Sequence, residues 1–394
     1  MFTKVGAPQQ DKIFALIRAF AADPRPEKVD LGVGVYRTDQ GTTPIMRAVR
    51  EAETRLYATE TTKSYVDFAG DPAFCEALRE LTLGGAVPPD RVAASATTGG
   101  TAAVRHALEL IKHISPAATI WVSDPSWPNH TAILDAVGLH HRRYRYLERS
   151  AGALDRTGIA EDLAGMRPGD VLLLHGCCHN PSGVDLGIAE WTEIAALCAD
   201  TGVLPLVDLA YHGFGDGIEA DAAGLRVLAG AVPELFLCVS GSKNFGLYRE
   251  RAGAVFAVVP KAAQRAALAA QLASLNRLSC SFPPDHGARL VTMILEDPDL
   301  RASWEGELAA MRARIQGVRQ GLAAALRRET GSDRFGFLAA HNGMFSLLPA
   351  TPEQMQRLRA EYGVYGVDDG RVNLAGLPTS GIPLAARAIA TILG

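Results

Sequence analysis

The sequence predicts an α/β fold, in which a mostly parallel sheet flanked by helices is joined to a smaller α+β domain. Short apolar runs recur between residues 119 and 259, and several are followed by a turn rich in Gly, Pro or Asn and a helical pattern. The runs are apolar throughout, as in strands that are buried on both faces of a parallel sheet. A chain of 394 residues is also too long for one compact core.

The first strand signal in the chain is KVDLGVGVY at residues 28–36, which we assign to the smaller domain. Helical patterns lie at residues 102–114 and 189–202, among the apolar runs of the main sheet. The predicted strands of that sheet are residues 119–123, 171–175, 204–208, 235–240 and 253–259.

The alternation of strands and helices ends near residue 262. Long helices are predicted at 261–276 and 307–329, and strands of the smaller domain at 335–348 and 371–376. The predicted parts of the chain are an N-terminal arm at 1–12, a small domain made of 13–43 and 306–394, and a large domain at 44–305.

Charge and hydropathy exclude several classes of protein. The net charge is −4 and no basic block occurs, so nucleic acid and anionic membranes are poor partners. The N-terminus has no apolar core before a small-residue cleavage site, and no run approaches the ~20 apolar residues of a membrane span. We therefore expect a cytoplasmic protein.

The six cysteines show no disulfide framework. The stretch HGCCHN at residues 175–180 is the one place where cysteines and histidines suggest a metal site. Because Cys177 and Cys178 are adjacent at a strand end, we expect them to point to opposite faces, and no second ligand pair has zinc-like spacing. We expect these cysteines to be packed in the core, with no metal bound.

Polar residues gather at the carboxyl ends of the predicted strands, where open α/β sheets bind ligands. Gly99, Gly100 and Thr101 begin the helix before the first of these strands, and the free N–H groups of a helix start bind anions. The residues at the strand ends are Trp127, His130, Asn180, Asp208, Tyr211, Ser240, Ser242 and Lys243.

Each of these signals has a simpler explanation when it is taken alone. The Gly-Gly-Thr start is often only a helix cap, Asp208 can cap a loop, Trp127 can be a core aromatic, and a lone lysine is usually solvated. Together they provide what pyridoxal phosphate requires. Its phosphate needs N–H groups, hydroxyls and an arginine, its ring nitrogen needs a carboxylate, and its aldehyde needs a lysine.

Other phosphate-binding motifs do not fit the sequence. SGSKNFG at residues 240–246 lacks the first glycine and the Gly-Lys order of a P-loop. LGVGVYRTDQG at residues 31–41 lacks the third glycine and the following helix of a dinucleotide site. A P-loop or dinucleotide enzyme is therefore disfavoured.

The chain resembles the class I pyridoxal-phosphate-dependent aminotransferases of fold type I, in the aspartate/aromatic aminotransferase subgroup. The resemblance covers almost the whole chain, through the motifs LGVGVYR, ETTKSY, GGT, WVSDPSWPNH, HGCCHNPSG, DLAYHGF, SKNFGLYRERAG, NGMFS and GRVNLAG. It implies that the large domain contains a sheet of the seven-stranded type and binds pyridoxal 5'-phosphate. It also implies amino acids and 2-oxo acids as substrates, and a homodimer with composite active sites.

The resemblance assigns roles around the cofactor. Lys243 is the lysine that binds the cofactor covalently and moves the substrate α-proton, and Asp208 pairs with the pyridine nitrogen. Tyr211 and Asn180 bind the phenolic oxygen, Trp127 stacks on the ring, and both Trp127 and Asn180 also border the substrate. The residues of the phosphate cradle are Gly99, Gly100, Thr101, Ser240, Ser242 and Arg251.

Four further roles concern the substrate and the second subunit. Arg371 binds the substrate α-carboxylate, and Gly34 lines the same site. Tyr65 reaches the phosphate from the neighbouring subunit. Arg277, from that subunit as well, binds the distal carboxylate of a dicarboxylic substrate.

Departures from the aspartate-specific pattern bear on the choice of substrate. Cys280 and Phe282 stand beside Arg277 where a tyrosine and an asparagine are usual, which favours a pocket that also admits an aromatic ring. The other departures are His212 for a usual glutamine and the acids Asp368 and Asp369 near Arg371. We expect an aromatic-amino-acid aminotransferase that uses tyrosine or phenylalanine with 2-oxoglutarate and also accepts aspartate and glutamate.

Three alternatives remain at this point. A strict aspartate aminotransferase is the nearest of them. A lyase or decarboxylase on the same fold does not need the distal arginine, Arg277. A non-catalytic binding protein is expected to lose Lys243 or Asp208, and this chain has both.

Overall fold

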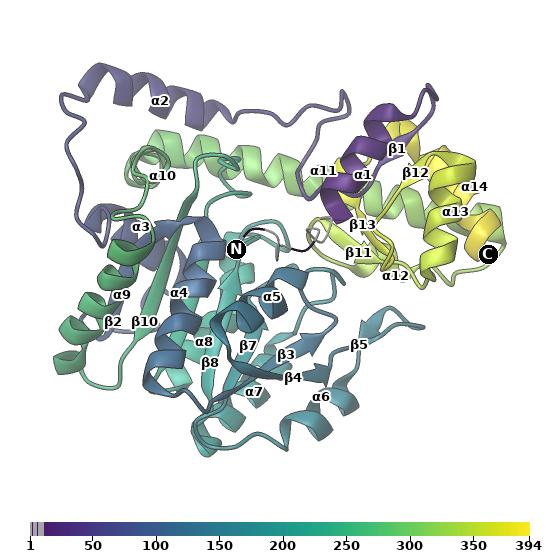
Figure 1. The fold of residues 1–394 in the computed structure, drawn as a ribbon. Helices are drawn as coiled ribbons and strands as arrows, with labels where there is room; N and C mark the ends of the chain where they lie inside the picture. The colour runs from purple at the N-terminus through teal and green to yellow at the C-terminus, as the bar shows by residue number, and fades with distance from the viewer. Residues whose placement is uncertain (1, 3–5, 7–11) are drawn as a thin grey trace.

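A seven-stranded sheet forms the central layer of the protein (Figure 1). The computed structural model describes residues 2, 6 and 12–394. The strand order is β2-β10-β9-β8-β7-β3-β4, and among these described strands β10 alone runs opposite to the others. The strands are β2 (Val92–Thr98), β3 (Thr119–Asp124), β4 (His140–Arg145), β7 (Val171–His175), β8 (Leu204–Leu209), β9 (Leu235–Ser240) and β10 (Ala252–Val258). The predicted α/β class and the mostly parallel sheet are confirmed.

The two edge strands, β2 and β4, were not predicted. β2 is made largely of alanine, serine and threonine, and β4 reads HHRRYR, so neither contains an apolar run. In β4, Tyr144 is buried while the adjacent Arg143 and Arg145 are exposed. Charged side chains on an edge strand discourage pairing with another chain. Apolar runs therefore identify the interior strands and miss the edges.

Helices cover both faces of the sheet, and β9 shows how its residues divide between them. Phe236 and Cys238 pack in the core that includes α4, α5 and α9, whereas Leu237 and Val239 pack in the core that includes α7 and α8. This alternation is the period of two of a β-strand. The five helices are α4 (Gly99–Ile114), α5 (Pro128–Val137), α7 (Ile188–Thr201), α8 (Ile218–Ala231) and α9 (Arg265–Ser279).

The smaller unit has short strands. β1 (Val29–Asp30) pairs with β12 (Val364–Tyr365), and β11 (Phe345–Leu347) pairs with β13 (Arg371–Asn373). The predicted strands at 28–36 and 335–348 were therefore too long.

Local hydrogen bonds and glycine conformation explain these shorter strands. The carboxylate of Asp30 accepts the backbone N–H of Gly32 at 2.9 Å, which turns the chain after β1. Gly343 has a φ of +69°, which breaks the extended backbone, and Phe337–Ala340 form the short helix α12.

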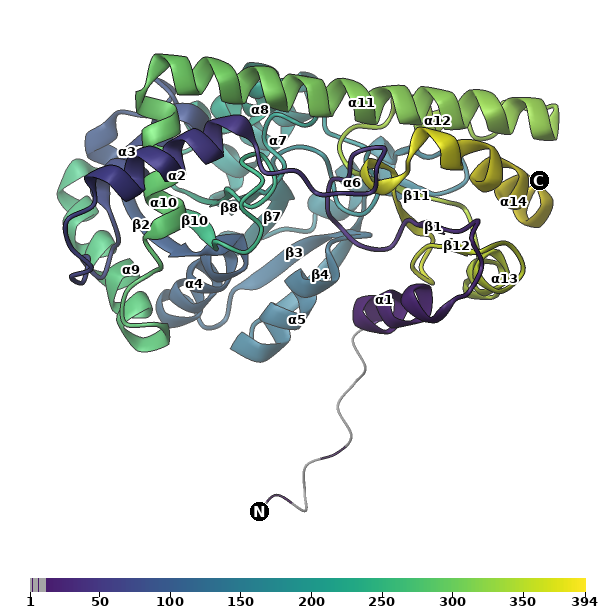
Figure 2. The same ribbon diagram turned by 90° about the horizontal axis from the view of Figure 1, so that it is seen from above.

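One long helix, α11 (Pro298–Thr330), connects the two units, and Figure 2 shows it running across both. Its 33 residues correspond to about 50 Å. Leu308 and Ile315 pack in the core of the large unit, whereas Val318 and Leu322 pack in the core of the small unit. The division at 305/306 remains a proposal, and α11 crosses it. The proposed arm at 1–12 lies almost wholly outside the described residues.

Further helices complete both units. They are α1 (Lys12–Ala22), α2 (Arg47–Thr59), α3 (Pro72–Thr82), α6 (Arg156–Leu163), α10 (His286–Glu296), α13 (Pro352–Tyr362) and α14 (Ile382–Leu393). Within the part of the chain that the structure describes, no helix is long and apolar enough to cross a membrane.

Candidate active site

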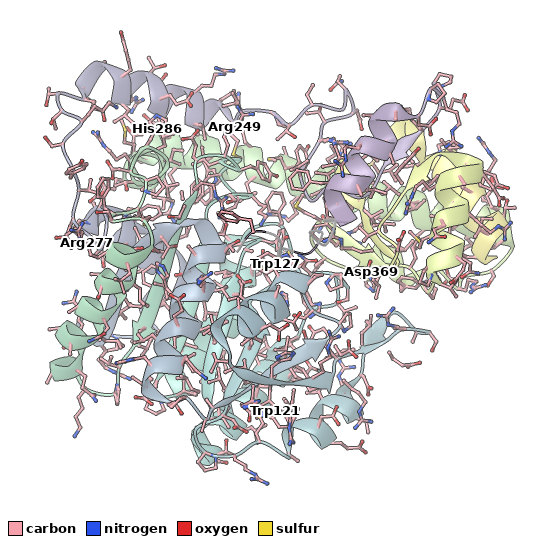
Figure 3. All side chains as sticks on the ribbon, in the orientation of Figure 1. Trp121, Trp127, Arg249, Arg277, His286 and Asp369 are labelled. Carbon is pink, nitrogen blue, oxygen red and sulfur yellow. The ribbon has the colours of Figure 1, made fainter. Side chains whose placement is uncertain are left out.

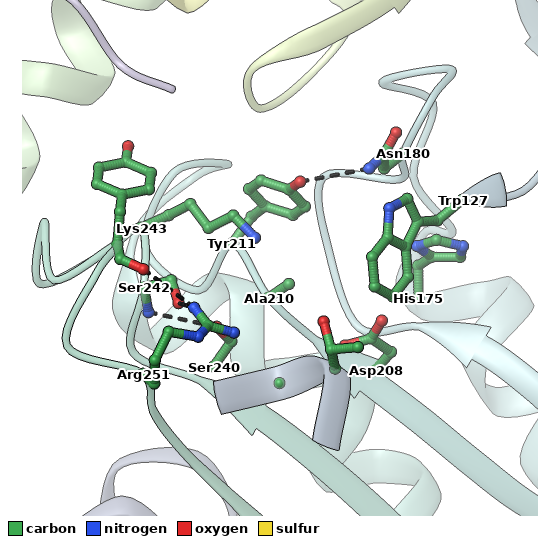
Figure 4. Close-up of a pocket in the computed structure, with 13 residues that line it drawn as sticks. Trp127, His175, Asn180, Asp208, Ala210, Tyr211, Ser240, Ser242, Lys243 and Arg251 are labelled. Carbon is green, nitrogen blue, oxygen red and sulfur yellow. Dashed lines mark hydrogen bonds between the residues drawn. The ribbon is translucent and has the colours of Figure 1, made fainter. Parts of the chain in front are cut away.

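A cavity of about 220 Å³ lies at the carboxyl ends of β7, β8 and β9 (Figure 4). The structure brings most of the predicted residues together here. Those that line the cavity are Gly100, Thr101, Trp127, Asn180, Asp208, Tyr211, Ser240, Ser242, Lys243 and Arg251. Three further lining residues, His175, Ala210 and Tyr248, were not predicted as site residues.

The start of α4 and the turn between β9 and β10 meet with no room for a side chain. A Cβ added to Gly99, whose φ is +74°, would stand 2.3 Å from Arg251 Nη2. A Cβ on Gly100 would stand 2.8 Å from the Cβ of Ser240. Arg251 Nη1 donates to Ser242 Oγ at 3.3 Å. Helix N–H groups, hydroxyls and a guanidinium therefore converge on one point, which suits a phosphate.

Lys243 extends into the cavity from the turn after β9, and Figure 4 shows its amine beside Tyr211. Its Nζ lies 4.8 Å from the centre of that ring and has no hydrogen-bond partner in the described part of the chain. Burial lowers the pKa of Lys243, and the positive charge of Arg251 lowers it further, while Asp208 acts in the opposite direction. A lowered pKa makes the neutral, nucleophilic amine more accessible near neutral pH.

Asp208 is the last residue but one of β8; it lines the cavity and is buried. Its Oδ2 accepts a hydrogen bond from Nε2 of His130 at 2.8 Å. Burial acts to raise the pKa of Asp208, but the His130 hydrogen bond and nearby positive charge, including Lys243, outweigh burial and hold the pKa below its ordinary value. Asp208 is therefore an ionised carboxylate at neutral pH.

His130, which is buried, belongs to a chain of polar groups with the partly buried Ser126 and His175. Its Nδ1 and the Nε2 of His175 both lie 3.1 Å from Ser126 Oγ. Its ring also meets the ring of Trp127 edge to face, with centroids 5.0 Å apart. His130 thus orients both the acid and the indole. The sequence placed His130 at this edge but gave no reason to link it to Asp208.

Tyr211 and Asn180 form one pair of the site. Asn180 Nδ2 donates to the hydroxyl of Tyr211 at 3.3 Å, and its Oδ1 is buried without a partner. Burial raises the pKa of Tyr211, so its hydroxyl is neutral and can donate. An unpaired buried amide oxygen is costly in a protein, and it marks a position where a bound group supplies the missing hydrogen bond.

Arg371 lies next to this pair, on β13. It is buried, its Nη2 donates to the carbonyl of Gly32 at 3.2 Å, and its Nε has no partner. The guanidinium lies 4.8 Å from the ring of Phe345, and a Cβ on Gly34 would stand 3.0 Å from Cζ of that ring. Gly34 and Arg371 thus meet around Phe345, which the sequence did not identify.

The two acids before Arg371 are used locally. Asp369 accepts the backbone N–H of Arg371 at 3.0 Å, and Asp368 forms an ion pair with Arg359 at 2.5 Å. Neither carboxylate lies within 4 Å of the Arg371 guanidinium as an ion pair. Arg371 therefore retains an unpaired charge for a substrate anion.

Tyr65 and Arg277 are not in the cavity. Figure 3 shows Arg277 near the end of α9, well apart from Trp127. Its Nη1 donates to Ser281 Oγ at 2.6 Å, and its guanidinium lies 4.9 Å from the centre of the Phe68 ring. Tyr65 is 84% exposed, and its ring centre lies 4.6 Å from that of Phe282. Arg277 and Tyr65 are thus both exposed, and each contacts an aromatic ring.

The expectation that Cys177 and Cys178 point to opposite faces is wrong. Both residues follow β7 rather than extend it, and Cys178 has a φ of +51°, so the alternation of a strand does not apply. Their sulfurs and one oxygen of Asp221 all lie within 4.8 Å of one another. The Asp221 carboxylate already accepts the backbone N–H groups of Gly213, Gly215 and Asp216. Asp221 thus holds the 213–216 turn.

The residues at the cavity fit pyridoxal phosphate. The anion cradle, the unpartnered Lys243 amine, the Asp208 carboxylate and the unpaired Asn180 oxygen match its phosphate, aldehyde, ring nitrogen and phenolic oxygen.

Comparison with known proteins gives results consistent with this site. The protein family described as aminotransferase class I and II matches residues 26–389. An aromatic-amino-acid aminotransferase of Paracoccus denitrificans is 51% identical over 379 residues, which cover 96% of each chain. An aspartate aminotransferase of Escherichia coli is 41% identical, and the match covers both chains completely.

Solved structures give the same result. An aromatic amino acid aminotransferase in complex with 3-indolebutyric acid has a TM-score of 0.97 at 49% identity, with both chains fully covered. An aromatic-amino-acid aminotransferase of Burkholderia pseudomallei, covalently bound to pyridoxal phosphate, has a TM-score of 0.97 at 38% identity, again with both chains fully covered.

Proposed function

Because this chain belongs to the class I and II aminotransferases, we propose that it transfers amino groups between aromatic amino acids and 2-oxo acids, and also accepts aspartate and glutamate. It is a pyridoxal-phosphate-dependent enzyme. The observation that carries the proposal is the cavity where Lys243, Asp208 and Arg251 meet at one edge of the sheet.

When bound, pyridoxal phosphate supplies an aldehyde that takes up amines and a ring that accepts the electrons released at the substrate α-carbon. The protein provides the remaining chemistry. Gly99, Gly100, Thr101, Ser240, Ser242 and Arg251 would hold the phosphate. Asp208, kept ionised beside His130, would hold a proton on the ring nitrogen. Tyr211 and Asn180 would donate to the phenolic oxygen, and Trp127 would cover the ring.

Lys243 has two tasks in this proposal. Its amine would hold the aldehyde of the cofactor, and the free amine would move the proton at the substrate α-carbon. Its lowered pKa suits both tasks, because each requires the neutral amine. Arg371 binds the α-carboxylate and so places the α-carbon next to Lys243.

Aromatic substrates are favoured over a strict preference for aspartate. Phe345 lines the region of Arg371, and Phe68 and Phe282 flank the residues that are proposed to reach the partner's site. Two relatives named aromatic-amino-acid aminotransferases share 51% and 44% of their residues with this chain, against 37–43% for four aspartate aminotransferases, although a tyrosine aminotransferase of Klebsiella pneumoniae shares 35%. A strict aspartate aminotransferase is the second candidate, because the chain retains Arg277.

The test is to mix the purified holoenzyme with phenylalanine, tyrosine, aspartate or glutamate and to follow the absorbance of the bound cofactor. All four amino acids should convert the cofactor from its aldehyde form to its amine form, and the aromatic pair should do so efficiently. Conversion by aspartate and glutamate alone would contradict the aromatic specificity and favour a strict aspartate aminotransferase. Conversion by none of the four would contradict the proposed activity.

The same proposal includes a homodimer with composite active sites, located in the cytoplasm. Tyr65 and Arg277 do not line the cavity of their own chain, and both are exposed. Exposed apolar side chains such as those of Tyr65 and Leu278, which are 84% and 82% exposed, favour association. The free state of all six cysteines fits a reducing compartment.

A further inference from the structure

Arg319, in the second half of α11, is buried with 0% of its surface exposed. Burial lowers its pKa to about 10, so the guanidinium stays charged at neutral pH. No carboxylate forms an ion pair with it in the described part of the chain; neutral acceptors take all its hydrogen bonds. These are the carbonyls of Leu338 (3.2 Å), Asn342 (3.0 Å), Gly343 (2.7 and 3.2 Å) and Phe345 (2.6 Å), and the hydroxyl of Ser346 (2.7 Å).

All these acceptors belong to one segment, residues 338–346. Its other side lies against the loop that carries Asn180. The N–H of Asn342 donates to the carbonyl of Gly183 at 2.8 Å. A Cβ on Gly343 would stand 2.3 Å from the Cβ of Cys178, and a Cβ on Gly183 would stand 2.4 Å from the carbonyl oxygen of Phe345. The segment is therefore fixed between the Arg319 guanidinium and the Asn180 loop.

Phe345 links this fixed segment to the candidate site. Its carbonyl is bound by Arg319, and its ring lies 4.8 Å from the Arg371 guanidinium. The same ring meets Tyr211 edge to face, with centroids 6.0 Å apart. A shift of the Phe345 backbone would therefore move the surface against which Arg371 rests.

We propose that Arg319 is a positioning residue for the substrate-carboxylate site, acting through Phe345 on Arg371. The inference rests on the proposed role of Arg371. Burying a charge without a paired anion is costly, and a residue that only fills the core does not need a charge. A planar fork with five N–H groups can hold carbonyls of several consecutive residues at once, whereas a lysine amine has only three donors. The choice of arginine here is thus explained by the need to fix a backbone segment.

The test uses the holoenzyme and 3-phenylpropionate, an aromatic carboxylate that has no amino group to transfer, with binding measured by calorimetry. Arg319→Lys should raise its Kd about tenfold, and Arg319→Met at least as much. The KM values for amino acid and 2-oxo acid should rise in parallel, with a smaller change in kcat. Phe345→Leu should raise the Kd similarly, and its combination with Arg319→Lys should add less than threefold, since both changes act through the same ring.

Leu322→Ala is the matched control, because Leu322 is fully buried one turn further along α11 and packs in the core of the small unit. It lowers stability without removing a donor, and it should leave the Kd within about twofold. Amide exchange of residues 342–346 should accelerate in the Arg319 variants and stay unchanged in Leu322→Ala.

Two outcomes overturn the inference. One is a wild-type Kd in Arg319→Lys, which keeps the charge and tests the idea even if Arg319→Met does not fold. The other is an equal rise of the Kd in Leu322→Ala. A wild-type Kd in Arg371→Ala would instead contradict the carboxylate site in the proposed function, and the exchange data would then show separately whether Arg319 fixes the segment.

Discussion

Asp208 lines the cavity and accepts a hydrogen bond from His130 at 2.8 Å. In Asp208→Asn the amide keeps the shape of the carboxylate but loses its charge. Hydrogen bonds to charged groups contribute about 1.5–3 kcal/mol, so kcat should fall on the order of tenfold to a hundredfold, with KM changed much less. Steady-state kinetics with glutamate and phenylalanine would measure both values.

Asp170→Asn is the control for that substitution. Asp170 also accepts a hydrogen bond from a side chain, Trp121 Nε1 at 3.0 Å, but it lies just before the start of β7, at the opposite end from the cavity. Its kcat should remain close to wild type. Unchanged kcat in Asp208→Asn would contradict the role of Asp208 in holding the ring-nitrogen proton.

The role proposed for Arg277 predicts a difference between the two classes of substrate. In Arg277→Ala the distal carboxylate of aspartate or glutamate loses its partner, and breaking a buried charge pair costs roughly 3–5 kcal/mol. Their kcat/KM should fall on the order of a hundred- to a thousandfold. Phenylalanine and tyrosine do not use this charge, so their kcat/KM should change little or rise.

The comparison requires all four amino acids to be measured on the same preparations of wild type, Arg277→Ala and Arg277→Lys. The lysine variant keeps the charge without the planar fork and should lie between the other two for the dicarboxylates. A parallel loss for aromatic and dicarboxylic substrates would rule out the distal-carboxylate role.

At the scale of elements, His341 links the segment after α12 to the large unit. Its Nδ1 lies 3.0 Å from Ser346 Oγ, and its Nε2 lies 2.8 Å from the carbonyl of Gly152. Burial lowers the pKa of His341 to about 4. An unfolded histidine has a pKa near ~6.5, so the unfolded chain binds the proton more readily.

Stability should therefore be lost as pH falls from about 6.5 towards 4, by roughly 3 kcal/mol from this residue alone. His341→Gln removes the titration and retains groups that can form similar hydrogen bonds. Urea unfolding at pH 7 and pH 4 should show a smaller loss of stability on acidification in the variant than in the wild type. Equal losses in both proteins would mean that His341 does not contribute.

The elements also show what the sequence can and cannot predict. Asp208 was identified at the end of one apolar run and Lys243 in the turn after another, because the end of a strand fixes where the neighbouring side chains lie. The contact of Phe345 with Arg371 depends on tertiary packing between segments that no local pattern relates. Cys178 was misjudged because its positive φ is a property of the folded loop. β4 was missed because it is an edge strand with mostly exposed, charged side chains, so its sequence contains no apolar run.

At the scale of the whole molecule, Tyr65 and Arg277 are proposed to act in the partner's site. Lys243→Ala subunits should be inactive, and so should subunits with both Tyr65→Phe and Arg277→Ala when assayed with dicarboxylates. A hybrid of the two contains one site with every functional residue. Mixing them should restore up to about a quarter of the wild-type activity, because random exchange yields half hybrids and each has one intact site.

Activity of the mixture should be followed together with subunit exchange, measured by mass spectrometry of the intact dimers. Exchange without recovery of activity would mean that each site is built within a single chain. The same measurement reports whether the protein is a dimer at all.

The continuous helix α11 has a consequence for how the length of this chain can change. Inserting a single residue between Ile315 and Val318 would rotate everything beyond it by about 100°, which turns Arg319 away from the carbonyls that it binds. Inserting seven residues would restore the orientation to within about 20° but would move the second core about 10 Å along the axis. The helix therefore fixes both the rotation of one core relative to the other about the helix axis and the distance between the two cores. Insertions or deletions are expected in the loops of this protein and not in the helix between its two cores.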